Sequence, residues 1–127
     1  MREYDCEDFV SDCHVRAAAE LISHRWDPVV VAALRSGPTR RALLLQRMGG
    51  ASDKALTESL RRLSARGLIA RAPGRLGAIY ELTPLGSSFA TGPLASLARW
   101  AADNQDRLAA TGGTLARRPE RGVSDEL

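Results

Sequence analysis

The sequence predicts a mainly helical domain that carries one short β-hairpin. Apolar residues recur at three- and four-residue steps through most of residues 13–66, which is the spacing of amphipathic helices. The period changes over residues 68–82, where two short β-prone runs flank a loop that contains proline and glycine. The chain has 127 residues, of which 44% are hydrophobic and 26% charged, so it suits one domain with one core.

Two helices are expected before residue 38. The first begins at Cys13, and its apolar stripe consists of Val15, Ala18, Ala19 and Ile22. The second begins at Asp27-Pro28, because aspartate can cap a helix and proline suits the first helical position. Residues 29–34 are nearly all apolar, which predicts that this second helix is central in the core.

Two further helices follow, joined by a tight turn. The first is expected over residues 39–48, and Gly49-Gly50-Ala51 forms the turn. Ser52 can cap the next helix, over residues 53–66, in which Leu56, Leu60 and Leu63 share one face. Gly67 stands where a left-handed helix end is expected.

The hairpin and a last helical region complete the order of elements. The strands are expected at residues 68–71 and 78–82, with a basic loop at residues 73–77. Thr83-Pro84 then starts a helical region that is interrupted near Gly92-Pro93 and ends at residues 111–113.

The net charge of +3 hides a strongly basic segment. Residues 35–75 hold ten basic side chains against Asp53 and Glu58, which gives this segment a charge of +8. A concentrated positive charge of this kind indicates a polyanionic partner, although a solvated basic surface is an equal alternative on charge alone.

The order of elements favours DNA binding. Two helices joined by a short turn that contains glycine are typical of a helix-turn-helix, whose second helix enters the major groove of DNA. A basic hairpin directly after that pair is the wing of a winged helix. The predicted fold is therefore mainly α: a winged helix-turn-helix with a two-stranded β wing and flanking dimerisation helices.

Several ordered motifs between residues 13 and 105 resemble one family. They are Cys13 with Ser23-His24-Arg25-Trp26, Gly37-Pro38-Thr39-Arg40, Gly50-Ala51-Ser52-Asp53-Lys54-Ala55-Leu56-Thr57, Leu60-Arg61-Arg62-Leu63, Gly67-Leu68-Ile69-Ala70-Arg71, Tyr80-Glu81-Leu82-Thr83-Pro84-Leu85-Gly86, and Leu97 with Trp100. In this order they resemble the HxlR-type winged helix-turn-helix regulators of bacteria, which are MarR-like. The resemblance implies a transcriptional regulator.

The chain also departs from that family's pattern. Arg41 stands where the family usually has phenylalanine, Leu43 replaces a glutamate, and Ser59 replaces a common arginine of the recognition helix. The wing is shorter and lacks the family's paired prolines. These departures concern DNA contacts and the target sequence rather than the fold.

The candidate DNA-binding residues are polar or basic positions on the helix-turn-helix and the hairpin: Arg40, Arg41, Ser52, Lys54, Thr57, Glu58, Arg61, Arg62, Arg71 and Arg75. Arginine has the forked donors that suit guanine, and lysine and threonine suit bases or phosphates. Glu58 fits only opposite a cytosine, because a carboxylate repels phosphates. The alternative is that the outward side chains form an ordinary polar helix face.

Cys13 is a candidate regulatory residue. The family resemblance implies that some members sense oxidants or electrophiles through a cysteine here, and the nearby His14 favours a thiolate. A small-molecule or redox effector is therefore a candidate partner, and an indifferent thiol is the favoured alternative. Cys6, Cys13, His14 and His24 fit no standard zinc spacing, so we expect no metal and no cofactor.

A homodimer is expected from the last helical region. Its apolar positions are Leu94, Leu97, Trp100, Ala101 and Leu108, which form one stripe too long for a small winged core to cover. The expected organisation is an acidic arm at residues 1–12, a DNA-binding and dimerisation domain at residues 13–110, and a disordered tail at residues 111–127.

The remaining patterns mainly exclude functions. No phosphate-binding loop, nucleophile elbow or paired-carboxylate arrangement indicates an enzyme. No apolar run is long enough to span a membrane, and acids occupy the N-terminal stretch where a signal peptide is apolar, so a cytoplasmic location is expected. The predicted partner is double-stranded DNA. The alternative is a winged-helix module that binds protein without DNA, which would often have lost the basic segment.

Overall fold

The computed structural model describes residues 14–112, and for residues 109–112 it describes the backbone alone. Contacts divide the chain into two compact units, one ending at Thr91 and the other starting at Gly92. The expected acidic arm, Cys13 and nearly all of the expected tail lie outside the described residues.

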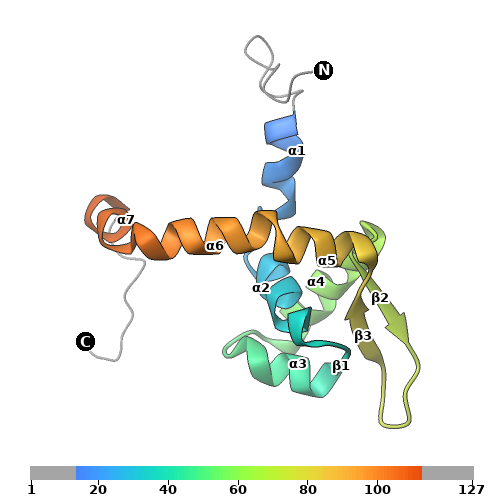
Figure 1. Cartoon of the computed structure of the whole chain (residues 1–127). Coiled ribbons are helices and arrows are strands. Elements are labelled where there is room, and N and C mark those ends of the chain that lie inside the picture. Colours follow the sequence, from blue (N-terminus) through green and yellow to red (C-terminus); the bar gives the residue numbers. More distant parts are fainter. Residues whose placement is uncertain (1–13, 113–127) are drawn as a thin grey trace. The chain divides into compact units, whose positions relative to one another are not determined.

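The first unit holds the helix-turn-helix and the hairpin (Figure 1). Its elements in chain order are α1 (His14–Leu21), α2 (Trp26–Ala33), the 3-10 turn η2 (Leu34–Ser36), β1 (Thr39–Arg40), α3 (Arg41–Met48), α4 (Asp53–Ala65), β2 (Ile69–Ala72), β3 (Ile79–Leu82) and α5 (Pro84–Thr91). The order confirms the predicted mainly helical winged helix-turn-helix.

The three strands form one antiparallel sheet in the order β1-β3-β2. The third strand, β1, corrects the prediction that Thr39 starts a helix. Thr39 lies opposite Tyr80, and the backbone N–H of Arg41 donates to the carbonyl of Ala78 at 3.2 Å. The chain satisfies the free edge of β3 in this way before helix α3 begins.

Helix α2 is at the centre of the core, as its apolar run predicts. Val30 and Val31 have no exposed surface, and α2 packs against α3, α4 and α5. Leu44 of α3 and Leu56 of α4 are also fully buried. Burial of each such side chain contributes about 1.5–3 kcal/mol, so these contacts fix α4 against the rest of the unit.

The predicted helix ends at Ser52, Gly67 and Thr83 are confirmed. The Ser52 hydroxyl accepts a hydrogen bond from the Ala55 N–H at 3.0 Å, and Gly67 has a φ of +78°. The Thr83 hydroxyl accepts from the Gly86 N–H at 3.0 Å and donates to the Gly67 carbonyl at 2.6 Å. The end of α4 and the start of α5 are thereby joined.

The predicted role of Asp27 as a helix cap is wrong. Helix α2 begins at Trp26, and no side chain caps it. Asp27 lies inside the first turn with no exposed surface, and its carboxylate accepts hydrogen bonds from Ser59 and Arg62 of α4. The Asp27 carboxylate therefore accepts hydrogen bonds from α4 across the core, whereas a capping carboxylate would accept them from the first turn of its own helix.

The second unit contains α6 (Pro93–Asp103) and α7 (Gln105–Gly112). The interruption at Gly92-Pro93 is confirmed, but the single apolar stripe from Leu94 to Leu108 is not. The helix is interrupted at Asn104, whose side-chain amide donates a hydrogen bond to the Trp100 carbonyl at 2.9 Å. Leu108 therefore belongs to α7, whereas the other four residues of the expected stripe belong to α6. Every helix within residues 14–112 is too short or too polar to cross a bilayer.

Candidate nucleic-acid interface

Helix α4 has a buried apolar face and an exposed polar face. Leu56, Leu60 and Leu63 are buried, whereas Lys54, Thr57 and Arg61 are exposed. The N-terminal amides of a capped helix carry a partial positive charge, which favours nearby anions. The first two turns of α4 thus combine side-chain donors with a favourable helix end.

Arg41 fixes the start of α3 to the first turns of α4. Its guanidinium donates to the Asp53 carboxylate at 2.6 Å and to the Thr57 hydroxyl at 2.5 Å. It also donates to the Asp53 backbone carbonyl at 3.3 Å. These bonds link α3 to α4 on the exposed side of the helix-turn-helix, and they keep the guanidinium of Arg41 at the N-terminal end of α4.

A buried group of three polar residues joins α4 to α2. The Ser59 hydroxyl donates to the Asp27 carboxylate at 2.6 Å, and Arg62 donates to it through Nε at 3.0 Å and through a terminal nitrogen at 2.9 Å. Burial by itself raises the pKa of Asp27, but the hydrogen bonds from Arg62 and Ser59 outweigh burial. The pKa of Asp27 is therefore lowered, and the carboxylate stays charged inside the core.

The hydrogen bonds that Arg62 forms in this group argue against its predicted DNA contact, which stays a prediction. The sequence predicted a phosphate contact for Arg62, but its donors face the buried Asp27 carboxylate instead. Turning the guanidinium outward would leave a carboxylate with no exposed surface uncompensated. We assign Arg62 a structural role.

Position 59, where this chain departs from the family pattern, also lies in the interior of the protein. Ser59 has no exposed surface, so the residue at this position does not belong to the outward face of α4. The replacement of a common arginine by serine therefore changes the contact with α2, and it leaves the exposed face of the helix unaltered.

The hairpin places one of its two arginines beside α4. Arg71 of β2 lies opposite Tyr80 of β3 in the antiparallel register, so both side chains lie on one face of the sheet. Arg75 and Leu76 are exposed in the loop between these strands, and Figure 1 shows this loop extending beyond the helices of the unit. The hairpin thus presents Arg71 at its base and Arg75 at its tip.

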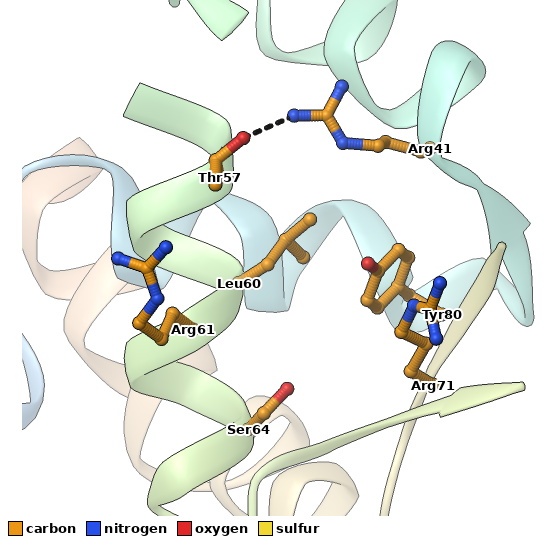
Figure 2. A pocket seen from close by; sticks show the side chains of 7 residues that line it. All are labelled: Arg41, Thr57, Leu60, Arg61, Ser64, Arg71 and Tyr80. Carbon is orange, nitrogen blue, oxygen red and sulfur yellow. Dashed lines mark hydrogen bonds between the residues drawn. The ribbon is translucent and has the colours of Figure 1, made fainter. Parts of the chain in front are cut away.

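A pocket of about 240 Å³ lies between α4, the start of α3 and the hairpin. Its lining residues are Arg41, Thr57, Leu60, Arg61, Ser64, Arg71 and Tyr80 (Figure 2). Four of the candidate residues, namely Arg41, Thr57, Arg61 and Arg71, therefore meet at one place. The pocket connects the proposed recognition helix with the wing.

The other candidate residues are not among the residues that line this pocket. Ser52 and Lys54 are exposed at the N-terminal end of α4, and Glu58 is half-buried one turn later. Arg40 borders a different hollow of about 430 Å³, together with Ala42, Leu43, Leu45 and Gln46. The structure therefore gathers Arg41, Thr57, Arg61 and Arg71 in one pocket, and it does not place Arg40 with them.

The charge of this surface is largely uncompensated. Within the described part of the chain, no ion pair or hydrogen bond engages the side chains of Lys54, Arg61, Arg71 or Arg75. Arg41 is the pocket arginine whose charge is paired, through Asp53. Guanidinium and ammonium groups that no described residue pairs suit phosphate oxygens.

Two polar residues of the pocket are not among the sequence-predicted site residues. Tyr80 was expected as part of a strand, and Ser64 was not singled out, yet both line the pocket with the arginines. The pairing of Arg71 with Tyr80 follows from the hairpin register, which the lengths of the two strands alone do not fix.

The structure gives the exposure of the expected dimer residues, and their role at an interface stays a prediction. Leu97 and Trp100 of α6 and Leu108 of α7 expose 42%, 55% and 42% of their surface, whereas Leu94 and Ala101 are half-buried. Among the residues that the structure describes, no group of three His, Cys, Asp or Glu side chains is arranged to hold a metal. The region described excludes Cys6 and Cys13, so the redox prediction stays a prediction.

Comparisons with known proteins agree with this architecture. A family model described as HxlR-like helix-turn-helix matches residues 21–109. The HTH-type transcriptional regulator YtfH of Escherichia coli (strain K12) is 33% identical over 97 residues, covering 72% of this chain and 75% of YtfH. The regulator YtcD of Bacillus subtilis (strain 168) is 32% identical over 118 residues, covering 89% and 90%. The solved structure of the transcriptional regulator ytfH from Salmonella typhimurium superposes with a TM-score of 0.69 at 30% identity, covering 87% and 100%.

Proposed function

Because the chain belongs to the HxlR-like helix-turn-helix family of DNA-binding transcriptional regulators, we propose that it binds operator DNA in a sequence-specific manner as a homodimer. The observation that carries this proposal is the outward face of α4, where Lys54, Thr57 and Arg61 are exposed beside a capped helix end. Residues on the N-terminal part of such a helix reach base edges in the major groove.

The proposed contacts divide by chemistry. Arg61 is the base-reading residue, because its forked donors match the acceptors of guanine and no described residue engages them. Arg41, Arg71 and Arg75 contact the phosphate backbone, with Arg75 at the tip of the wing. Ser52, Lys54 and Thr57 contact bases or phosphates, and Arg40 is a peripheral phosphate contact. The retained basic surface favours DNA over the alternative of a protein-binding module.

The dimer is proposed to form through the second unit. Leu97 and Trp100 lie on one helix and are each more than two-fifths exposed, which is unfavourable in water unless another apolar surface covers them. Two copies related by a two-fold axis would match a palindromic operator, whose half-sites lie about one helical turn apart.

The experiment for DNA binding is a titration of the full-length protein with the intergenic DNA beside its own gene, at several salt concentrations. Each phosphate contact releases counterions, so the logarithm of the affinity is expected to fall linearly with the logarithm of the salt concentration. A scrambled duplex of equal length is the control for sequence preference. Absence of binding at low salt, or equal affinity for the scrambled duplex, would contradict the proposal.

The experiment for the dimer compares two charged variants of α6. Light scattering on full-length protein at micromolar concentration should give a dimer for the wild type and for Ala98→Glu. Leu97→Glu should give a monomer, because it places a charge within the proposed apolar contact. Both positions are exposed, so neither variant disturbs the core. A monomeric wild type, or a dimeric Leu97→Glu, would show that this surface is not the interface.

A further inference from the structure

The pocket between α4 and the hairpin is lined by hydrogen-bond donors. Arg41, Arg61 and Arg71 belong to the lining, and hydroxyls come from Thr57, Ser64 and Tyr80. Figure 2 shows the guanidinium group of Arg61 on the side of α4 away from Tyr80. None of the described residues that line this pocket carries a carboxylate. Such a lining recognises a ligand that accepts hydrogen bonds and carries negative charge.

Tyr80 provides a separate reason to expect a ligand here. It is 8% exposed, and no hydrogen bond engages its hydroxyl among residues 14–108. Figure 2 shows this hydroxyl pointing into the pocket, towards α4. Buried hydroxyl groups nearly always have a hydrogen-bond partner, so an acceptor that enters the pocket would satisfy this donor.

The bonds of Arg41 orient a second hydroxyl donor. The Thr57 hydroxyl accepts a hydrogen bond from Arg41 at 2.5 Å, which leaves its own proton to donate elsewhere. Asp53 compensates the charge of Arg41, whereas Arg61 and Arg71 form no ion pair with any described residue. Arg71 therefore contributes an uncompensated positive charge at the pocket.

We propose that this pocket binds one phosphate group. A phosphate offers several acceptor oxygens, and its negative charge suits the guanidinium of Arg71, which no described residue pairs. The pocket has a volume of about 240 Å³, which leaves room for a phosphate group. Drug-sized ligands occupy larger pockets, of about 300–1,000 Å³.

This inference extends the proposed function, because the pocket lies within the proposed DNA-binding surface. The phosphate has two potential sources, the DNA backbone and a free phosphorylated compound. The chemistry is shared, and a free compound in this pocket would compete with DNA.

The test uses inorganic phosphate and the full-length protein without DNA. Backbone amide resonances are followed by NMR during a phosphate titration in which chloride keeps the ionic strength constant. Saturable shifts are expected at residues 57, 61, 64, 71 and 80. Tyr80→Phe should weaken phosphate binding about ten-fold, because it removes one hydrogen bond to a charged group while the ring keeps its place. Arg71→Ala should weaken binding at least as much.

Two control variants remove the same groups elsewhere. Ser88→Ala removes an exposed hydroxyl on α5, and Arg35→Ala removes an exposed arginine on η2. Both should leave phosphate affinity within about two-fold of the wild type. Shifts that do not saturate, or a Tyr80→Phe variant with wild-type phosphate affinity, would overturn the proposal.

A DNA arm distinguishes the two sources. If phosphate displaces operator DNA at constant ionic strength and Tyr80→Phe weakens DNA binding, the pocket holds a backbone phosphate. If Tyr80→Phe loses phosphate binding but keeps full DNA affinity, the pocket serves a free phosphorylated compound. A protein that binds phosphate here but no DNA would contradict the proposed function and leave this inference standing.

Discussion

Two arginine–aspartate pairs join α4 to its neighbours, and they differ in their access to water. Arg62 and Asp27 join α4 to α2 at 2.9 Å, with 29% and 0% of their side chains exposed. Arg41 and Asp53 join α3 to α4 at 2.6 Å, with 32% and 71% exposed. The first pair lies at the core, and the second lies on the proposed DNA-binding surface.

We assign the two pairs different roles along α4: the Asp27 pair contributes to stability, and the Asp53 pair contributes to binding. A buried carboxylate depends on its cation, because no water replaces that cation when it is lost. An exposed pair exchanges protein contacts for water at little cost, so its value lies in where it holds the charged groups. We infer that the Asp27 pair fixes the position of α4, and that the Asp53 pair organises the groups around the phosphate pocket.

The largest expected effect comes from Arg62→Ala. This variant should lower the free energy of unfolding by about 3–5 kcal/mol, because it leaves the Asp27 charge buried without a cation. Urea unfolding followed by circular dichroism measures the loss. A change below about 1 kcal/mol would mean that the pair does not hold α4.

A double variant tests whether the missing cation is the cause. Asp27→Leu combined with Arg62→Met replaces both charges by apolar groups, and the Ser59 hydroxyl can then donate to a carbonyl of its own helix. Most of the stability lost in Arg62→Ala should return. A double variant as unstable as Arg62→Ala would show that packing, rather than charge, explains the loss.

A smaller effect is expected for Asp53→Ala. Exposed ion pairs contribute about 0–1 kcal/mol, and the aspartate adds a small favourable term at the helix N-terminus. The free energy of unfolding should therefore fall by about 1 kcal/mol or less, measured by the same urea titration. A loss equal to that of Arg62→Ala would remove the difference between the two pairs.

The local features of the fold could be predicted from the sequence. The cap at Ser52, the left-handed end at Gly67 and the start of α5 after Thr83 depend on residues within a few positions of each other. The apolar spacing of Leu56, Leu60 and Leu63 also indicates which face of α4 is buried. Ser59 lies three positions after Leu56 and four before Leu63, so the same spacing places it on the buried face.

Features that depend on distant partners could not be predicted in this way. The sequence predicts a cap at Asp27 because its neighbour is Pro28. The residues that donate hydrogen bonds to its carboxylate lie 32 and 35 positions further along the chain. Strand β1 has two residues, which is too short for any period to appear, and it exists because β3 offers a free edge. Helix spacing places Arg61 with Lys54 and Thr57 on the exposed face, but it does not reveal that the partner of Arg62 is a carboxylate on α2, 35 positions away.

The most direct measurement of the central claim is the affinity of Arg61→Ala for operator DNA. This variant should lose about 1–3 kcal/mol in binding free energy and show a relaxed preference at one base position. The free energy of unfolding should stay within about 0.5 kcal/mol of the wild type, because Arg61 is exposed and unpaired within residues 14–108. Arg35→Ala, which removes the same charge outside α4 and the hairpin, should cost much less affinity. If folded Arg61→Ala binds the operator as tightly as the wild type, the outward face of α4 does not read DNA.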